Sequence, residues 1–408
     1  MRIFIFIVPI LFLIFGCYRP EVTTPPRNKN VSQCLNGTTS YQAFNQRIFS
    51  DIEQISSNQY EIVLSEQAQF FHLSWHSSSS FPESEDLVVI LENSTRLSLQ
   101  KADHHDHGET SFSHTESFSF ESSETINSFN LILPANYLIS GLKIEAMAKP
   151  QTSLMLTQKS DFKPEGYQSY PSDFRIISRR EWAAGQFTFP QVSQDFTKVE
   201  RIVVHHTAAL FSNGEDCGFK VRSIYKHHTD SNGWNDIGYQ FLVCPNGQVF
   251  EGRGGGKGIV GAHAFGSNYG TLAISVIGNY EESGGASNAL SPEAEESITS
   301  LIAWLAFEHE INLVNPDIYT FPNRTNVLIP AVTWHNFMTA NASLNRSTTN
   351  CAGSQLIRDH LENGSIAQKA NQKLQELGRT PPKLEPSTGD SDRESNGNSD
   401  SEDAAPRC

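Results

Sequence analysis

Residues 202–207 of the chain read Ile-Val-Val-His-His-Thr, and this short stretch decides the fold. Three β-branched residues in succession predict a buried β-strand, and the polar residues that follow mark its end. A side chain at that point can project from the edge of a sheet into a cleft. The adjacent histidines are a weak signal by themselves, because such pairs also occur in cores and on surfaces.

The sequence around this strand is typical of a mixed α/β domain that begins near Phe174. Residues 239–250 predict a hairpin with an Asn-Gly turn between two strands, and residues 271–277 predict a further strand. Ser291-Pro292-Glu293 supplies a cap, a first-turn proline and an acidic side chain to open a helix. The apolar face of that helix is predicted to consist of Ile298, Leu301, Ile302 and Leu305.

The preceding region, residues 40–150, has a different pattern. Apolar or alternating runs such as 69–75, 87–91 and 112–120 are separated by segments rich in Ser, Asn and Gly. Several short strands of this kind predict a small all-β, sandwich-like domain. Within it, His104-His105-Asp106-His107 lies among charged residues and a glycine. We interpret this segment as a solvated loop, with a metal site as the alternative.

The N-terminus has the features of an export signal. Arg2 precedes an unbroken run of thirteen apolar residues, 3–15. As a helix this run would rise about 20 Å, less than the ~30 Å hydrocarbon core of a bilayer. Residues 1–17 therefore indicate a secretory signal. Residues 14–17, Ile-Phe-Gly-Cys, resemble the lipobox of bacterial lipoproteins, which implies cleavage before Cys17 and its acylation; an ordinary signal peptide is the alternative.

Composition narrows the class of protein. The 408-residue chain has a formal net charge of −15, which argues against a nucleic acid partner, because proteins bind phosphates with clusters of basic side chains.

Outside the two predicted domains, residues 18–39 and 151–173 are typical of linkers. The segment 366–408 predicts a short helical remnant followed by an acidic tail, from about residue 381, that we expect to be disordered. We expect an exported monomer, held to the cell envelope by a lipid anchor.

Two histidines and a cysteine from distant segments can form a zinc site. His335 follows an apolar stretch, residues 327–332, and Cys351 precedes Ala-Gly. Together with His205 they would supply three ligands and leave a fourth position open, the arrangement of catalytic zinc. The chain contains 14 histidines and six cysteines, so spacing alone does not select these three.

Six blocks of sequence resemble the peptidoglycan recognition protein and type-2 N-acetylmuramoyl-L-alanine amidase family. They occur in family order and place a domain of this kind over residues 174–365. The resemblance implies a mixed central β-sheet flanked by helices, preceded here by the all-β region. The blocks are Ser178–Ala184, Val203–Ala208, Gly233–Val243, Asn246–Gly254, Gly261–Ala264 and Ile274–Tyr280.

The resemblance also implies roles for particular residues. His205, His335 and Cys351 match the zinc ligands of the family, while Tyr239 and Thr349 match residues that face the reacting carbonyl. The implied activity is zinc-dependent hydrolysis of the amide between N-acetylmuramic acid and the L-alanine of the peptidoglycan stem peptide. Two alternatives are a recognition module that binds peptidoglycan or muropeptides without cleaving them, and a structural envelope lipoprotein.

This chain departs from the family pattern near the second and third ligands. Fifteen residues lie between His335 and Cys351, a longer spacing than usual, and Cys-Ala-Gly replaces Cys-Pro-Gly. Because loop-closure entropy grows only logarithmically with length, the insertion itself costs little. His309 and His360 are the alternatives to His335 as the second histidine ligand.

The resemblance further implies a disulfide between Cys217 and Cys244, which suits an oxidising compartment; two unpaired buried thiols are the alternative. Four more residues are predicted to contact substrate. For two of these a structural role is equally open, since His228 lies on the apolar face of a predicted helix and Arg253 can form an ordinary structural pair. The four are His206, His228, Arg253 and His263.

Overall fold

The computed structural model describes residues 50–77, 82, 87–99, 114–147, 164–169, 171, 174–183, 187, 189, 195–209, 211, 216–282, 289–321, 323–342 and 349–379. Several sequence predictions lie outside the described residues: the signal and Cys17, the segment 104–107, and the acidic tail from 381. Cys34 and Cys408 lie outside them as well. No helix among the described residues is long and apolar enough to cross a membrane.

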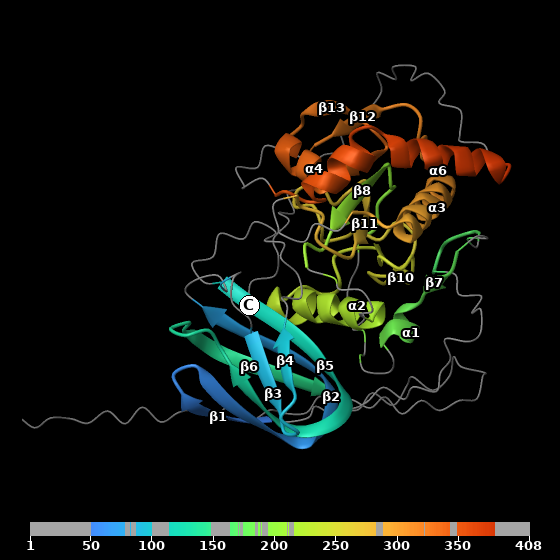
Figure 1. Cartoon of the computed structure of the whole chain (residues 1–408). Coiled ribbons are helices and arrows are strands. Elements are labelled where there is room, and N and C mark those ends of the chain that lie inside the picture. The colour runs from blue at the N-terminus through green and yellow to red at the C-terminus, as the bar shows by residue number, and fades with distance from the viewer. Residues whose placement is uncertain are drawn as a thin grey trace, which may run out of the picture. The chain divides into compact units, whose positions relative to one another are not determined.

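The first region is a single six-stranded antiparallel sheet, which confirms the all-β prediction (Figure 1). Its strands follow the order β1-β2-β5-β3-β4, and β6 pairs with β2. Alternate residues of the strands face one core, in which Phe71 stacks on Phe120 and Trp75 on Phe118. The strands are β1 (Ser50–Ser56), β2 (Gln59–Ser77), β3 (Leu87–Leu91), β4 (Arg96–Leu99), β5 (His114–Ile132) and β6 (Ile139–Met147).

Two of these strands are much longer than the sequence predicts. The run 112–120 was expected to be one short strand, yet β5 continues from His114 to Ile132, a length of 19 residues. The pairing of β2 with β5 shifts register between Val63 and Phe70, which is the signature of β-bulges. A bulge lets the strand continue through a polar, serine-rich stretch. The amino-acid composition of that stretch therefore does not show that the two halves belong to one strand.

The second region is a mixed six-stranded sheet with the order β14-β8-β11-β9-β10-β7. Strands β14, β8, β11 and β9 run parallel, β10 is antiparallel to β9, and β7 is parallel to β10. A separate hairpin, β12 (Asp317–Thr320) and β13 (Asn326–Ile329), precedes β14. The strands of the main sheet are β7 (Ile176–Ile177), β8 (Arg201–His206), β9 (Phe241–Val243), β10 (Val249–Glu251), β11 (Thr271–Val276) and β14 (Val332–Trp334).

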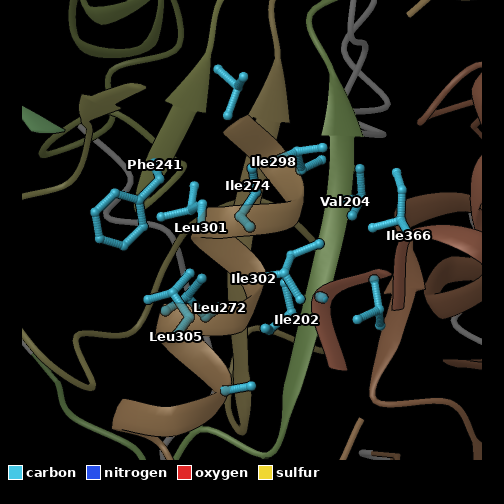
Figure 2. Close-up of a cluster of buried hydrophobic side chains, with 14 of the residues drawn as sticks. Ile202, Val204, Phe241, Leu272, Ile274, Ile298, Leu301, Ile302, Leu305 and Ile366 are labelled. Atoms are coloured by element: carbon cyan, nitrogen blue, oxygen red, sulfur yellow. The ribbon is translucent and has the colours of Figure 1, made fainter. Parts of the chain in front are cut away.

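Helices flank this sheet, as the resemblance implies. The predicted apolar face of α3 packs on residues of β8 and β11, including Ile202 and Ile274 (Figure 2). The Ser291 hydroxyl accepts a hydrogen bond from the N–H of Ala294 at 3.0 Å, which confirms the predicted cap. The helices are α1 (Arg179–Ala183), α2 (Cys217–Lys226), the π-helix η1 (His227–Ser231), α3 (Pro292–Glu308), α4 (His335–Ala342), α5 (Ser354–Leu356), the π-helix η2 (Ile357–Leu361) and α6 (Ser365–Glu376).

Helix α6 belongs to the core of this region. The side chains of Ile366, Ala370 and Leu374 are buried in the same cluster as the apolar face of α3. The domain boundary predicted at residue 365 therefore lies just before a helix whose side chains pack in the core of that same domain. Its composition is rich in Gln and Lys, so the three buried positions were not recognised from the sequence.

Polar side chains of the first sheet contact helix α2 and the π-helix that follows it. Ser117 Oγ on β5 lies 2.6 Å from His227 Nδ1, and both residues are buried. Lys226 forms ion pairs with Glu145 on β6 and with Asp230, the latter at 2.6 Å. These contacts support the helix that precedes the loop carrying Tyr239.

Candidate metal centre

Strand register brings two of the predicted ligands to one edge of the sheet. Strands β8 and β14 are parallel, and Trp334 pairs with Val204. The next residues along the two strands are His205 and His335, so they emerge side by side at the carboxyl ends. In open α/β sheets this edge is where ligands bind. The two imidazole rings are 4.6 Å apart, centre to centre.

The longer segment before the third ligand returns the chain to the same place. Helix α4 begins at His335 and accounts for seven of the fifteen residues between His335 and Cys351. The backbone N–H of Asn336 then donates to the carbonyl of Cys351 at 2.6 Å, and the Asn336 amide donates to the Thr349 carbonyl. Asn336 therefore ties the returning loop to the start of α4.

The turn after Cys351 requires a glycine. Gly353 has φ 92°, a conformation that other residues rarely adopt, and a Cβ there would lie 2.7 Å from the backbone of Tyr280. This close approach packs the turn against the segment after β11. The alanine that replaces the family's proline, Ala352, is fully buried in the core beside it.

His205, His335 and Cys351 form a cluster that can hold a metal ion. One donor atom of each lies within 4.8 Å of the others, and all three residues are buried. The Cys351 Sγ is 3.4 Å from His205 Nδ1. For zinc with bonds of about 2.3 Å to sulfur and 2.0–2.1 Å to nitrogen, tetrahedral geometry places these atoms about 3.5 Å apart. The donor set and the spacing therefore fit zinc.

The backbone also favours a thiolate at Cys351. The N–H of His206 points at Cys351 Sγ over 3.4 Å, and a hydrogen bond of this kind stabilises negative charge on sulfur.

The two alternative histidines have other neighbours than the cluster of His205, His335 and Cys351. His309 ends α3 and its ring lies 5.6 Å from that of Tyr167, while His360 Nδ1 lies 3.3 Å from a carboxylate oxygen of Glu295.

Two hydroxyl side chains were predicted to act beside the metal. The Tyr239 ring is fully buried and lies 5.2 Å from the His205 ring. Thr349 is half-buried, and its Oγ1 accepts the N–H of Cys351 at 3.2 Å. Because the Thr349 oxygen serves as an acceptor in this bond, its own proton is available to donate.

The neighbouring histidines have structural partners. His206 is buried, and its Nδ1 accepts the N–H of Tyr280 at 3.1 Å. His228 is also buried; its Nδ1 accepts the N–H of Gly238 at 3.1 Å, and its ring lies 4.6 Å from that of Trp234. In this arrangement both rings support the backbone near the site, and substrate contact by either remains a prediction.

His263 lies against a predicted ligand. Its Nδ1 is 3.0 Å from His205 Nε2, and only 1% of its surface is exposed. Burial, assisted by the charge of Arg253, lowers the pKa of His263 to about 3, so the ring is neutral. The structure places the His263 ring against His205, and the substrate contact suggested by the sequence remains a prediction.

Arg253 supports the backbone segment just before β9, which carries Tyr239. Its guanidinium donates to the Ile237 carbonyl at 2.9 Å, and its backbone N–H donates to the Tyr239 carbonyl at 2.7 Å. Burial lowers the pKa of Arg253, while Asp236 acts in the opposite direction. These bonds agree with the structural pairing that the sequence left open.

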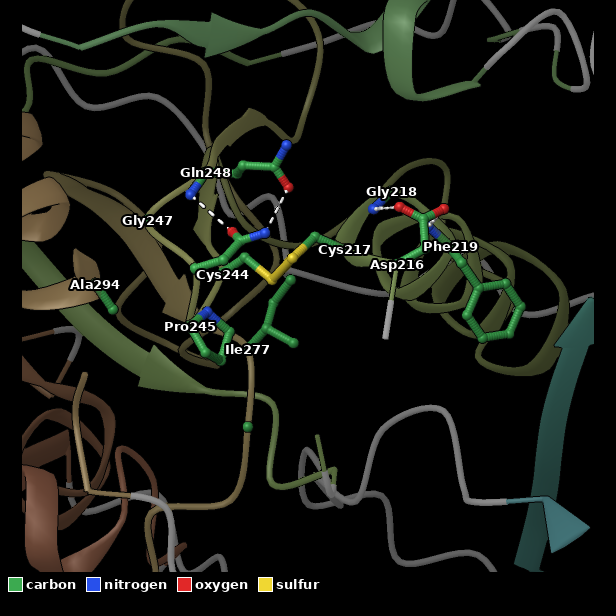
Figure 3. The surroundings of a disulfide bond; sticks show 12 residues. Asp216, Cys217, Gly218, Phe219, Cys244, Pro245, Gly247, Gln248, Ile277 and Ala294 are labelled. Atoms are coloured by element: carbon green, nitrogen blue, oxygen red, sulfur yellow. Dashed lines mark hydrogen bonds between the residues drawn. A yellow bond between two sulfur atoms is a disulfide. The ribbon is translucent and has the colours of Figure 1, made fainter. Parts of the chain in front are cut away.

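The predicted disulfide is present between Cys217 and Cys244 (Figure 3). Cys217 opens α2, whose cap residue Asp216 accepts the N–H groups of Gly218 and Phe219 at 3.0 Å each. Cys244 follows β9 at the start of the Asn-Gly hairpin. The bond therefore links the start of α2 to the central sheet.

His205, His335 and Cys351 thus form a buried cluster at the carboxyl edge of a mixed sheet, and imidazole nitrogen and thiolate sulfur are ligands that zinc takes in proteins. Residues 195–354 match the Amidase_2 family, described as N-acetylmuramoyl-L-alanine amidase. The chain therefore contains an Amidase_2 domain, and this match includes all three members of the centre.

Proteins with similar sequences include recognition proteins and an amidase. Peptidoglycan-recognition protein SC2 of Drosophila melanogaster is 39% identical over 106 residues, which are 26% of this chain and 55% of the relative. The human N-acetylmuramoyl-L-alanine amidase is 31% identical over 143 residues, 34% of this chain and 24% of the relative. The chain spans about half the length of the fly relative and less of the human one.

Solved structures with some likeness include two recognition proteins. Bumblebee PGRP-SA has a TM-score of 0.35 and 26% identity, over 46% of this chain and 96% of the other. The complex of PGRP-LCa and PGRP-LCx, solved with tracheal cytotoxin bound, contains a chain with a TM-score of 0.34 and 26% identity, covering 45% of this chain and 95% of that one.

Proposed function

We propose that the protein is a zinc-dependent N-acetylmuramoyl-L-alanine amidase that cleaves the amide between N-acetylmuramic acid and L-alanine in peptidoglycan. The observation that carries the proposal is the convergence of His205, His335 and Cys351, with Tyr239 beside them. A binding module has no need of three metal ligands with an open fourth position. The family match and the similarity to an amidase point to the same chemistry.

The residues of the site divide the work in this proposal. His205, His335 and Cys351 hold the ion, which supplies a Lewis acid and lowers the pKa of a bound water towards ~7. The hydroxyls of Tyr239 and Thr349 donate hydrogen bonds to the carbonyl oxygen as it gains negative charge. Burial of the cluster removes competing water and strengthens these interactions.

Digestion of purified peptidoglycan tests the activity. Wild-type protein should release peptides with a free L-alanine amino terminus, and a chelator should abolish the release until zinc is restored. Cys351→Ala should be inactive while keeping its fold by circular dichroism. Retention of the protein on peptidoglycan without any released peptide, at every zinc concentration, would instead identify the recognition module.

The compartment is a second part of the proposal. The apolar run 3–15 and Cys17 support export and attachment to the cell envelope through acylation of that cysteine. Incorporation of a labelled fatty acid by the wild type, and its loss in Cys17→Ser, are the expected results. Export of an unlabelled wild-type protein would leave an ordinary signal peptide as the explanation.

A further inference from the structure

The loop that carries His263 is built to hold its ring in one place. The side-chain oxygen of Asn268 accepts the N–H groups of both His263 and Ala264, each at 2.9 Å. A Cβ at position 261 would lie 2.4 Å from the His263 ring, so only glycine allows the ring to occupy this position. The ring then lies between His205 and the first residue of β11, Thr271.

The hydroxyl of Thr271 determines the direction of hydrogen bonding through this ring. Thr271 Oγ1 has one proton, and it lies 2.7 Å from the Ser267 carbonyl and 2.9 Å from the Asn268 carbonyl. Carbonyl oxygens only accept, so the proton is committed to them. Toward His263 Nε2, at 3.4 Å, Thr271 Oγ1 can therefore act only as an acceptor.

The remaining assignments follow along the chain of contacts. Since His263 Nε2 carries the ring's proton, Nδ1 of the same neutral ring is an acceptor. His263 Nδ1 lies 3.0 Å from His205 Nε2, which must then be the donor. A neutral His205 that is protonated on Nε2 has its lone pair on Nδ1, the atom 3.4 Å from Cys351 Sγ.

We propose that Thr271 and His263 form a relay of hydrogen bonds that fixes the tautomer of His205 and presents its Nδ1 to the metal. This inference rests on the metal site of the proposed function. It assigns His263 and Thr271 as positioning residues that act through His205. In the opposite tautomer, the His205 proton would occupy the nitrogen that faces Cys351, and metal binding would first require its transfer.

Two substitutions at Thr271 distinguish the effect of its hydroxyl from the effect of its side-chain shape. Thr271→Val keeps the volume of this fully buried residue but removes the acceptor, whereas Thr271→Ser keeps the hydroxyl. Loss of an outer partner of a metal-bound histidine weakens metal binding by about 10-fold to 100-fold. We expect a loss of this size for Thr271→Val and for His263→Leu, and near wild-type affinity for Thr271→Ser.

Zinc affinity, measured by competition with a chromogenic chelator, is the first readout. Ser275→Ala is the matched control, because Ser275 is a fully buried residue on the same strand whose hydroxyl has no hydrogen-bond partner among the described residues. Its zinc affinity should equal that of the wild type. Melting temperatures of all variants show whether each one folds.

The tautomer itself can be observed by nitrogen-15 NMR of the metal-free protein. His205 should carry its proton on Nε2 in the wild type, and Thr271→Val should populate the other tautomer. Protonation of His205 on Nδ1 in the wild type would overturn the relay, as would folded Thr271→Val and His263→Leu proteins with wild-type zinc affinity. A wild type that binds no zinc would instead refute the proposed function.

Discussion

Asn336 offers a sharp test of how the site tolerates its long insertion. The residue follows His335 directly, and its amide donates to the carbonyl of Thr349, two residues before Cys351. Asn336→Ala removes this bond but keeps the backbone bond from Asn336 to the Cys351 carbonyl. A neutral hydrogen bond contributes about 0.5–1.5 kcal/mol. If this bond stabilises the position of Cys351 relative to the two histidines, losing its free energy should lower the zinc affinity about 2-fold to 13-fold.

Competition with a chromogenic chelator at constant pH measures the change. Asn341→Ala is the matched control, because the Asn341 amide donates to the Phe337 carbonyl within the same helix, at 2.8 Å, and among the described residues it makes no bond to the segment 349–351. It should leave zinc affinity unchanged. Equal losses in the two variants, or none in Asn336→Ala, would refute the idea that Asn336 closes the site.

Three further predictions concern catalysis, the disulfide and acid stability. Tyr239→Phe should bind zinc normally but lower kcat by about 10²–10³, the usual effect of losing an oxyanion donor; an unchanged kcat would remove Tyr239 from the mechanism. Replacing Cys217 and Cys244 by serine opens a loop of sequence separation 27 and should cost about 3.5 kcal/mol in urea unfolding; a loss below about 1 kcal/mol would contradict this. Burial, aided by Lys257, lowers the pKa of His309 to about 4, so unfolding takes up a proton and stability should fall between about pH 6.5 and 4, by up to ~1.4 kcal/mol per pH unit; His309→Gln should show a shallower slope in the chelator-treated protein.

The parts of the fold that were predicted correctly depend on local patterns. A β-branched run predicts strand β8, and the spacing of four apolar residues predicts the buried face of α3. The Asn-Gly turn likewise predicts the hairpin of β9 and β10, where Gly247 has φ 84°. In each case, neighbours in the sequence determine the structure.

The parts that were missed depend on contacts between distant residues. The serine-rich centre of β5 continues as strand because β2 pairs with it on both sides of the register shift. The place of His263 beside His205 follows from the parallel pairing of β8 with β11 and from the loop before β11. Its motif was recognised, but a histidine near a site can face either the substrate or a ligand, and only the fold distinguishes the two.

The resemblance to a known family predicted which residues form the site. Their positions relative to one another are set by the pairing of strands in the sheet. Spacing along the chain left His335 in competition with His309 and His360. The register of β14 against β8 favours His335, because it sets His335 level with His205. Asn336 then explains how Cys351 returns to the cluster across fifteen residues.

Native mass spectrometry of the purified protein gives the most direct measurement of the metal centre. The wild type, loaded with zinc and dialysed, should carry a single zinc ion per chain, and Cys351→Ala should carry none after the same treatment. Zinc retained equally by both proteins, or absent from the wild type, would contradict a centre formed by His205, His335 and Cys351.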